Sequence, residues 1–197
     1  MSHKRPADHW NERAKKEGYS ARSAYKLEEI QRRFRVIPRN PRVLDLGCAP
    51  GSWTEYVARV TRYKGSVVGI DIQDVPGYRG TLLKASIFDV DPAKVLEELG
   101  GPADLVISDM APSTTGSRFT DHVRQIELAE AGRVLAARVL RPGGNFVVKV
   151  FDGEDAPDFV KRMRADYGKA RRVKPDATRN KSVEFFMVGM GRKPASG

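Results

Sequence analysis

The sequence is poor in cysteine and histidine and has no long apolar run. Its 197 residues include one cysteine, Cys48, and three histidines. A single cysteine excludes an internal disulfide framework and is typical of a reducing compartment, so we expect a cytoplasmic protein. So few potential ligands argue against a structural zinc site, and we expect no bound metal. Since no apolar segment is long enough to cross a bilayer, we expect no membrane partner.

Negative charge is also scarce. Against 35 lysines and arginines stand 25 aspartates and glutamates, which gives a formal net charge of +10 and a sequence pI of about 9.9. Such an excess points to a polyanionic partner such as RNA, although a solvated, charge-rich surface is the plainer alternative. The basic residues gather between positions 4 and 42 and again between 161 and 181. The two clusters form one patch if the two ends of the chain meet in the fold.

The remaining composition is that of a globular protein, with 40% hydrophobic and 30% charged residues and a mean hydropathy of −0.48. We expect a single domain over residues 1–197, in which residues 1–18 form a loosely ordered basic arm. Apolar runs with strand and helix spacing alternate along the rest of the chain. Strands are predicted over 42–46, 67–70, 81–85, 105–108, 145–151, 171–174 and 182–189, and helices over 21–34, 92–99, 122–140 and 156–167, with a turn at 141–144. This alternation predicts an α/β fold, with a mostly parallel sheet and helices on both of its faces.

The first predicted strand ends in the turn Asp45-Leu46-Gly47-Cys48-Ala49-Pro50-Gly51-Ser52-Trp53. Glycine lets the backbone approach a ligand closely because it has no Cβ atom. The spacing is not the G-x-G-x-x-G pattern that binds a pyrophosphate in dinucleotide folds. The pattern D-x-G-x-x-x-G is instead similar to the first motif of S-adenosylmethionine-dependent methyltransferases. Taken alone, it is also compatible with an ordinary strand-to-helix turn.

Carboxylates follow three of the predicted strands. Asp71 ends the second strand, where a carboxylate accepts hydrogen bonds from the hydroxyls of a ribose, or is simply solvated. Asp89 follows the third strand and is placed to accept a bond from an adenine amino group, while the nearby Asp91 is suited to cap a helix. Asp109 follows the buried run 105–108, where an unpaired charge is costly unless it has a function. Since the carboxyl ends of parallel strands meet at one edge, we expect Asp71 and Asp109 beside the first turn.

Two further charges lie inside apolar strands. Lys149 interrupts the run 146–151, and Glu184 interrupts the run 182–188. A lysine in such a run either extends to the edge of the sheet or is desolvated, and a desolvated amine gives up its proton more readily. Two isolated charges in two apolar strands are best explained as partners of each other.

Five blocks of sequence form a longer pattern. They are Arg22-Ser23-Ala24-Tyr25-Lys26-Leu27, the turn at 45–53, Ser108-Asp109-Met110-Ala111-Pro112, Val147-Val148-Lys149-Val150-Phe151 and Lys174-Pro175-Asp176, with Glu184 following at the expected place. In this order they resemble the FtsJ/RrmJ family of ribose 2′-O-methyltransferases over essentially the whole chain. Five ordered blocks are far more specific than any one of them. The resemblance implies a Rossmann-like class I methyltransferase fold that uses S-adenosyl-L-methionine.

The resemblance also implies roles for particular residues. The family's Lys-Asp-Lys-Glu catalytic tetrad falls on Lys26, Asp109, Lys149 and Glu184. Lys149 would then be the general base for a ribose hydroxyl. Contacts to S-adenosylmethionine fall on Asp45, Gly47, Gly51, Trp53, Asp71, Asp89 and Asp109. The implied substrate is a ribose, expected to be that of a uridine, in 23S ribosomal RNA or the large ribosomal subunit, and we expect the chain to act on it as a monomer.

The chain departs from the family pattern at two places. The family commonly has Gly-Asp after the third strand, whereas this chain has Ser86-Ile87-Phe88-Asp89, so the adenine contact is shifted or lost. A second glycine often follows the Ala-Pro-Gly turn of the family. This chain has Ser52 there, and serine is a suitable helix N-cap.

Several alternatives stay open at the level of sequence. Trp53 is either a cofactor contact or part of the core, and Tyr19 and Tyr25 either stack on RNA bases or pack the first helix. A transfer RNA ribose methyltransferase is the nearest functional alternative. A non-catalytic RNA-binding assembly factor on the same scaffold is disfavoured, because it would be expected to lose Lys149 or Asp109. A nicotinamide-dependent dehydrogenase is disfavoured because its glycine pattern is absent.

Overall fold

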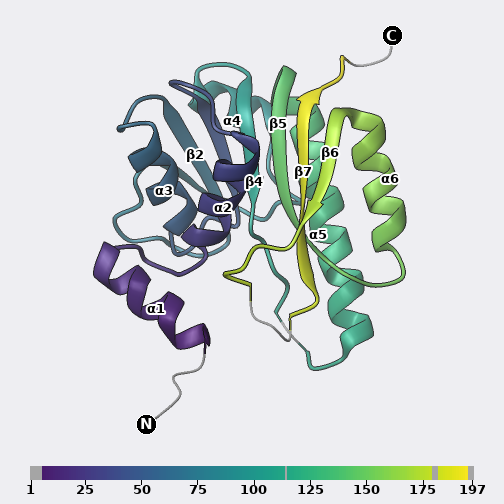
Figure 1. The fold of residues 1–197 in the computed structure, drawn as a ribbon. Coiled ribbons are helices and arrows are strands. Elements are labelled where there is room, and N and C mark those ends of the chain that lie inside the picture. The colour runs from purple at the N-terminus through teal and green to yellow at the C-terminus, as the bar shows by residue number, and fades with distance from the viewer. Residues whose placement is uncertain (1–5, 114, 179–181, 195–197) are drawn as a thin grey trace.

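A seven-stranded sheet forms the middle of the molecule (Figure 1). The computed structural model describes residues 6–113, 115–178 and 182–194. The sheet order is β3-β2-β1-β4-β5-β7-β6, in which β1 to β5 pair in parallel and β7 is antiparallel to both of its neighbours. The strands are β1 (Arg42–Leu46), β2 (Ser66–Asp71), β3 (Thr81–Lys84), β4 (Ala103–Ser108), β5 (Leu140–Phe151), β6 (Tyr167–Val173) and β7 (Glu184–Arg192). The predicted mostly parallel α/β sheet is therefore confirmed.

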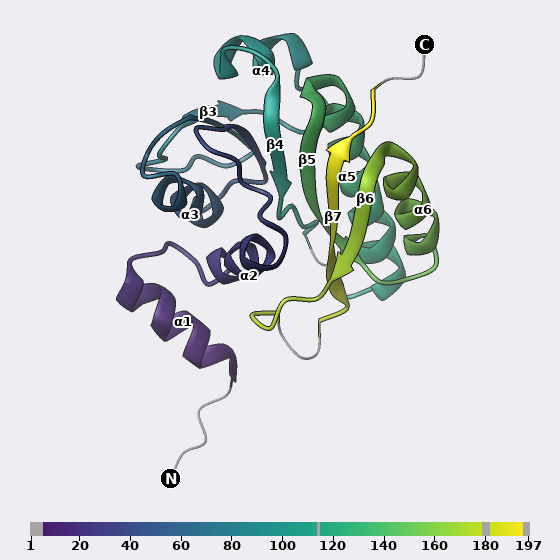
Figure 2. The ribbon, with the colours of Figure 1, turned by 45° about the horizontal axis from the view of Figure 1, so that its top comes forward.

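Helices cover both faces of the sheet, as predicted. They are α1 (Pro6–Glu17), α2 (Ala24–Phe34), α3 (Ser52–Val60), α4 (Pro92–Leu99), α5 (Arg118–Val139) and α6 (Ala156–Asp166). One core cluster joins the sheet to α4, α5 and α6, and a second joins its other face to α2 and α3. Figure 2 shows α2 and α3 on the near side of the sheet and α5 and α6 behind it. Because both faces are covered, the central strands are runs of valine, leucine, isoleucine and phenylalanine.

Residues 6–17 form a helix, so the expectation of a loosely ordered arm over 1–18 is corrected for its described part. Ala14 of α1 is buried against Tyr25 of α2 and Ala177 of the loop after β6. The guanidinium of Arg13 lies 4.2 Å from the centre of the Tyr25 ring and pairs with Glu17 at 2.8 Å. A short polar helix is marginal on its own, so its order depends on these contacts with distant segments. Residues 1–5 of the predicted arm lie outside the described residues.

The predicted turn at 141–144 lies inside strand β5. That strand begins at Leu140, directly after α5, and not at residue 145. Its pairing with β4 shifts register, because Ala103 pairs with Leu140 whereas Leu105 pairs with Asn145. The extra residues of β5 therefore form an irregularity in the ladder, which the proline and two glycines at 142–144 accommodate.

Candidate active site

The turn after β1 requires glycine for two different reasons. Gly47 has a φ of +70°, and a Cβ atom on it would lie 2.6 Å from Cγ of Met110. Gly51 has a φ of +108° and is the N-cap residue of α3. Ser52 is therefore the first residue of the helix and not its cap, and its buried hydroxyl lies 2.7 Å from that of Ser23. The turn thus packs tightly against the segment after β4, as a strand end that bounds a ligand site must.

Asp45 lies beneath this turn and does not line the cavity that follows. Its side chain is buried, and its carboxylate accepts a 2.7 Å hydrogen bond from the hydroxyl of Thr54. That hydroxyl in turn accepts a hydrogen bond from Tyr78 at 2.7 Å. Burial, together with the negative charges of Asp109 and Asp71, raises the pKa of Asp45 to about 7 against the opposing bond from Thr54. Asp45 supports the turn from inside the protein.

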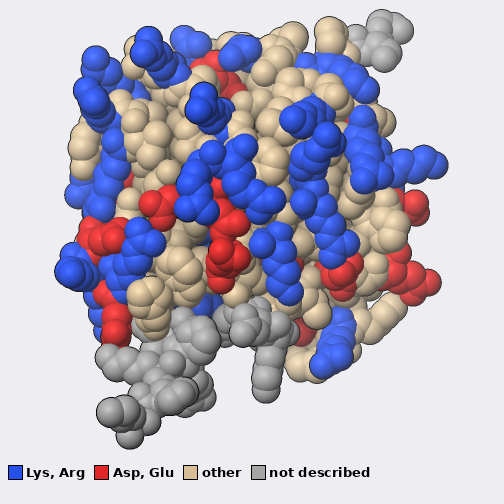
Figure 3. Space-filling model, in the orientation of Figure 1, with Lys and Arg blue, Asp and Glu red and all other residues tan. Residues whose placement is uncertain are grey.

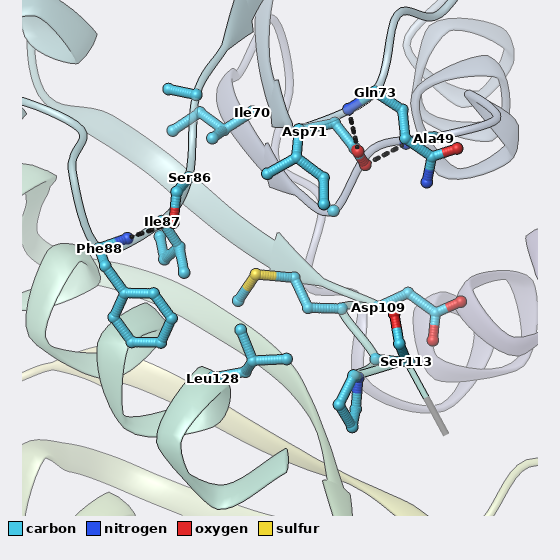
Figure 4. Close-up of a pocket in the computed structure, with 16 residues that line it drawn as sticks. Ala49, Ile70, Asp71, Gln73, Ser86, Ile87, Phe88, Asp109, Ser113 and Leu128 are labelled. Carbon is cyan, nitrogen blue, oxygen red and sulfur yellow. Dashed lines mark hydrogen bonds between the residues drawn. The ribbon is translucent and has the colours of Figure 1, made fainter. Parts of the chain in front are cut away.

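A cavity of about 430 Å³ opens where β1, β2 and β4 end. Asp71 lines it at the end of β2, and its two carboxylate oxygens accept hydrogen bonds from the backbone N–H groups of Ala49 and Gln73, each at 2.9 Å (Figure 4). Gly47 and Asp109 line the cavity as well. This is the edge at which open α/β sheets bind ligands, beside the point where the strand order reverses. The sequence prediction that Asp71 and Asp109 flank the first turn is confirmed in this respect.

Three charged side chains meet next to Asp109. Lys26 on α2 pairs with Glu184 at the start of β7 at 2.5 Å and lies 3.9 Å from Oδ1 of Asp109. Lys149 on β5 lies 3.1 Å from the same oxygen and donates a 2.7 Å hydrogen bond to the Asp109 carbonyl. The two lysines are 7% and 5% exposed, and the two carboxylates compensate positive charge in this buried cluster. The four residues that the family resemblance singled out are brought together. The expectation that Lys149 and Glu184 are partners of each other is corrected, because Glu184 pairs with Lys26 and Lys149 pairs with Asp109.

One carboxylate oxygen in this cluster is short of partners. Oδ1 of Asp109 is buried and accepts no well-aligned hydrogen bond from any described residue, although both lysine nitrogens lie within 4 Å. A buried acceptor of this kind normally has a partner. Its hydrogen-bonding capacity is therefore not used by the described residues.

A buried glutamine that was not predicted from the sequence bonds to the backbone of Lys149. Gln125 of α5 is 1% exposed, and its side-chain amide donates a 2.9 Å hydrogen bond to the Lys149 carbonyl. The ladder between β4 and β5 ends where Ser108 pairs with Val148, so this carbonyl lies just beyond it. A buried glutamine on a helix carries no local sequence signal, and only the fold reveals this contact.

Besides Asp45, three further predicted cofactor residues do not line the cavity. Gly51 caps α3, and Trp53 lies in the core, with its indole N–H donating to the Ser23 carbonyl at 2.8 Å and its ring 5.7 Å from that of Phe186. Asp89 is exposed and also lies outside the cavity wall. Asp91, by contrast, caps α4 by accepting the N–H of Ala93, as the sequence suggested for it.

The two tyrosines considered for base stacking pack within the protein. Tyr25 is 3% exposed in the cluster that anchors α1. Tyr19 is partly buried against the same cluster, and the guanidinium of Arg59 lies 4.1 Å from its ring centre. Both rings are therefore largely occupied by protein contacts.

The residues that line the cavity fit S-adenosylmethionine. Its volume lies in the range of about 300–1,000 Å³ that is usual for small-molecule sites. The Asp71 carboxylate has lone pairs left to accept bonds from ribose hydroxyls, since each oxygen accepts one backbone N–H. The glycine at position 47 keeps side-chain atoms out of the turn beside it. No group of three or more His, Cys, Asp and Glu side chains arranged to hold a metal ion is found within the described ranges.

Comparison with known proteins identifies the family to which these features belong. The sequence matches the FtsJ-like methyltransferase family over residues 19–192, which includes all four charged residues of the cluster. The chain belongs to that family. The FtsJ-like match also includes Gly47, Asp71 and the rest of the cavity wall. The shared region therefore contains the whole candidate site.

Two bacterial relatives of this FtsJ-like chain share about two fifths of its residues. Ribosomal RNA large subunit methyltransferase E of Desulfosudis oleivorans is 42% identical over 96% of this chain and 92% of its own length. The protein of the same name from Bdellovibrio bacteriovorus is 40% identical over 95% of this chain and 98% of its own. A crystal structure of a ribosomal RNA methyltransferase from Plasmodium falciparum superimposes with a TM-score of 0.77 over 88% of this chain and 98% of its own. At 23% identity, that structure supports the fold alone.

Exposed cations gather on one face of this FtsJ-like chain. Figure 3 shows Lys and Arg side chains gathered over much of the face on which α2 and β6 lie in Figure 1. Exposed members on these elements and just beyond α2 include Arg32, Arg33, Arg35, Lys169 and Arg171. None of the described helices combines the length and apolar character needed to cross a membrane.

Proposed function

We propose that this chain is a monomeric cytoplasmic enzyme that methylates the 2′-hydroxyl of a uridine ribose in RNA of the large ribosomal subunit. S-Adenosylmethionine is the methyl donor in this proposal. The observation that carries it is the convergence of Lys26, Asp109, Lys149 and Glu184 at one side of the cavity, from three different elements and the segment after β4. The names of the relatives support the choice of ribosomal RNA.

The cavity holds the donor in this proposal. Asp71 binds its ribose hydroxyls, and the turn at Gly47 and the wall at Asp109 hold its methionine part. When bound, S-adenosylmethionine supplies a methyl group that is already activated by its sulfonium charge. The protein's task is then to align the attacking oxygen and to remove its proton.

Lys149 accepts the proton of the ribose hydroxyl. In this proposal Lys149 acts as a neutral amine, so that the hydroxyl proton would pass to Nζ of Lys149 while the oxygen takes the methyl group that the donor supplies. That nitrogen already faces the carbonyl and the carboxylate of Asp109, which stabilise the ammonium as it forms. The unsatisfied Oδ1 of Asp109 accepts a bond from the incoming hydroxyl, and Glu184 holds Lys26 beside it.

The basic face supports an RNA substrate. The two basic segments of the sequence are neighbours in the fold, because the N–H of Asp176, after β6, donates a 2.8 Å bond to Glu29 of α2. Lysines and arginines on α2 and β6 therefore lie around one surface. Contacts of such residues with phosphates account for most of the affinity of RNA-binding proteins and weaken as salt rises.

The test is transfer of a labelled methyl group. We would incubate the full chain with methyl-labelled S-adenosylmethionine and intact large subunits, dissociated ribosomal RNA or bulk transfer RNA, and map the label in nuclease digests. Lys149→Met removes the amine, and Lys161→Met is the matched control because Lys161 is exposed on α6. We expect label on a uridine ribose of large-subunit RNA, reduced by about 10²–10⁴-fold in Lys149→Met and unchanged in Lys161→Met.

The other outcomes separate the alternatives. Label that appears only in transfer RNA would keep the chemistry and overturn the target. Label on a base would overturn the ribose assignment. Cofactor binding with no transfer to any RNA would favour the non-catalytic assembly factor.

A further inference from the structure

The cavity has an apolar end. Ile87 and Phe88, from the segment after β3, and Leu128 of α5 line it there, and Figure 4 shows them on the opposite side of the view from Asp109. Asp71 lies between the two sides, beside Ala49 and Gln73. Among the described residues of the wall, the carboxylates are Asp71 and Asp109. The apolar end therefore has no acidic side chain of its own.

A tight turn directs the apolar side chains to the cavity and Asp89 away from it. The N–H of Asp89 donates a 3.0 Å bond to the Ser86 carbonyl, which closes a turn over residues 86–89. The N–H of Phe88 donates to the Ser86 hydroxyl at 3.3 Å. Ile87 and Phe88, in the middle of the turn, line the cavity, whereas Asp89 is exposed.

Ile87 and Phe88 also bound a second space. They line a neighbouring cavity of about 550 Å³, whose other walls include Val90, Pro92 and Val134. Phe88 is 62% exposed, which is unusual for so large an apolar side chain. An exposed ring between two cavities is available for contact with the face or edge of a flat ligand.

We propose that the purine of the methyl donor is held at Ile87 and Phe88 by apolar contact, and that no carboxylate of this chain reads its 6-amino group. The inference rests on the proposed function, because it assumes that the cavity binds S-adenosylmethionine. With the donor's ribose at Asp71 and its methyl group directed to Lys149 and Asp109, the opposite, apolar end is left for the purine. The acidic residue nearest in sequence, Asp89, takes no part.

This arrangement predicts weak selectivity at purine position 6. A site built to hydrogen-bond a group rejects analogues that lack it by about 10⁴–10⁵-fold, whereas apolar pockets discriminate by about 10–200-fold at most. Ser86 is the neutral polar side chain of that part of the wall, and an amino group that meets no charged acceptor loses only about 0.5–1.5 kcal/mol, or about tenfold, when it is replaced by hydrogen. The wild-type chain should therefore bind a ligand with a 6-aminopurine and its analogue with hydrogen at position 6 with similar affinity.

The experiment measures binding and needs no RNA. Titration calorimetry would give the Kd of S-adenosylhomocysteine and of its analogue with hydrogen in place of the 6-amino group. We expect the two Kd values to agree within about tenfold for the wild type and for Asp89→Asn. Phe88→Ala should weaken both compounds by about tenfold or more, because a base stacked on an aromatic ring loses about 1–3 kcal/mol on such a change.

A gain-of-selectivity variant completes the test. Ile87→Asp places a carboxylate at the apolar end and should make the amino compound bind at least about tenfold tighter than its analogue. The wild type and Asp89→Asn leave the apolar wall intact, so they decide the question even if Ile87→Asp does not fold. Rejection of the analogue by more than about 100-fold in the wild type, or loss of affinity for S-adenosylhomocysteine in Asp89→Asn, would overturn the inference while the proposed function stands. Failure of both compounds to bind the wild type would overturn the proposed function as well.

Discussion

Replacing Asp45 with asparagine is expected to change how the stability of the protein depends on pH. The Asp45 carboxyl is buried beneath the first turn, and its pKa is raised from 3.8 to about 7, chiefly by burial. Between these two values the folded chain holds a proton that the unfolded chain has released. The free energy of unfolding must therefore fall as pH rises from about 4 to about 7 and level off above that. Asparagine keeps an oxygen that can accept the bond from Thr54 but has no proton to lose.

The size of the effect follows from the difference in pKa. Each pKa unit corresponds to about 1.4 kcal/mol, so this carboxyl alone lowers the free energy of unfolding by about 2.5 kcal/mol between pH 5 and pH 8. Urea denaturation of the wild type and Asp45→Asn at both pH values gives the difference directly. From pH 5 to pH 8, the free energy of unfolding of the wild type should fall by about that amount relative to Asp45→Asn. The m-values of both proteins should be unchanged.

A control with the opposite kind of carboxylate tests the reasoning. Asp104 is partly buried, which raises its pKa, but the N–H of Arg42 and the guanidinium of Arg141 outweigh burial and hold that pKa below its usual value. It stays ionised from pH 5 to pH 8 in both states, so the effect of Asp104→Asn should be the same at both pH values. A shift of less than about 1 kcal/mol for Asp45→Asn would show that the buried carboxyl does not titrate in this window.

Three further substitutions separate catalytic, structural and backbone roles. Glu184→Gln removes the charge that pairs with Lys26. Because Lys26 is then misplaced, kcat should fall by about 100-fold while the Kd of S-adenosylhomocysteine is unchanged. An equal loss in kcat and in cofactor affinity would argue against a positioning role for Glu184. Trp53→Phe deletes a buried hydrogen bond and should lower the free energy of unfolding by about 1–3 kcal/mol in urea titrations. Its cofactor Kd should stay constant, and a tenfold rise would return Trp53 to the binding site. Gly47→Ala introduces a clash with Met110 at a positive φ and should destabilise the fold by more than about 1 kcal/mol. A normal melting temperature for that variant would contradict the geometry of the turn.

The sheet was predictable because its strands carry strong local signals. Apolar runs such as 105–108 and 145–151 are short, rich in branched residues and followed by charges or turns, and their alternation with helical spacing fixes the parallel topology. Asp71 and Asp109 could be placed for the same reason, since both directly follow such runs. The family resemblance placed Lys26 and Glu184 in one tetrad, whereas the strand pattern alone suggested Lys149 as the partner of Glu184. A contact between α2 and β7 has no local pattern.

What the sequence missed depends on contacts between distant segments. Helix α1 is polar, and its order rests on the burial of Ala14 against Tyr25 and Ala177. The support of Lys149 by Gln125 exists only because β4 ends where it does. Such contacts have no periodicity that a sequence pattern could reveal.

The order of the site's parts along the chain bears on how the protein is made. The described residues that line the cavity lie between positions 47 and 128, whereas the charged cluster adds Lys26 near one end and Glu184 near the other. During synthesis, a nascent chain therefore contains every cavity residue well before Glu184 has been added. The partner of Lys26 lies on β7, which is the last strand in the chain and inserts between β5 and β6. Because the last strand completes both the sheet and the cluster, Lys26 gains its Glu184 partner only when nearly all of the described chain has been made.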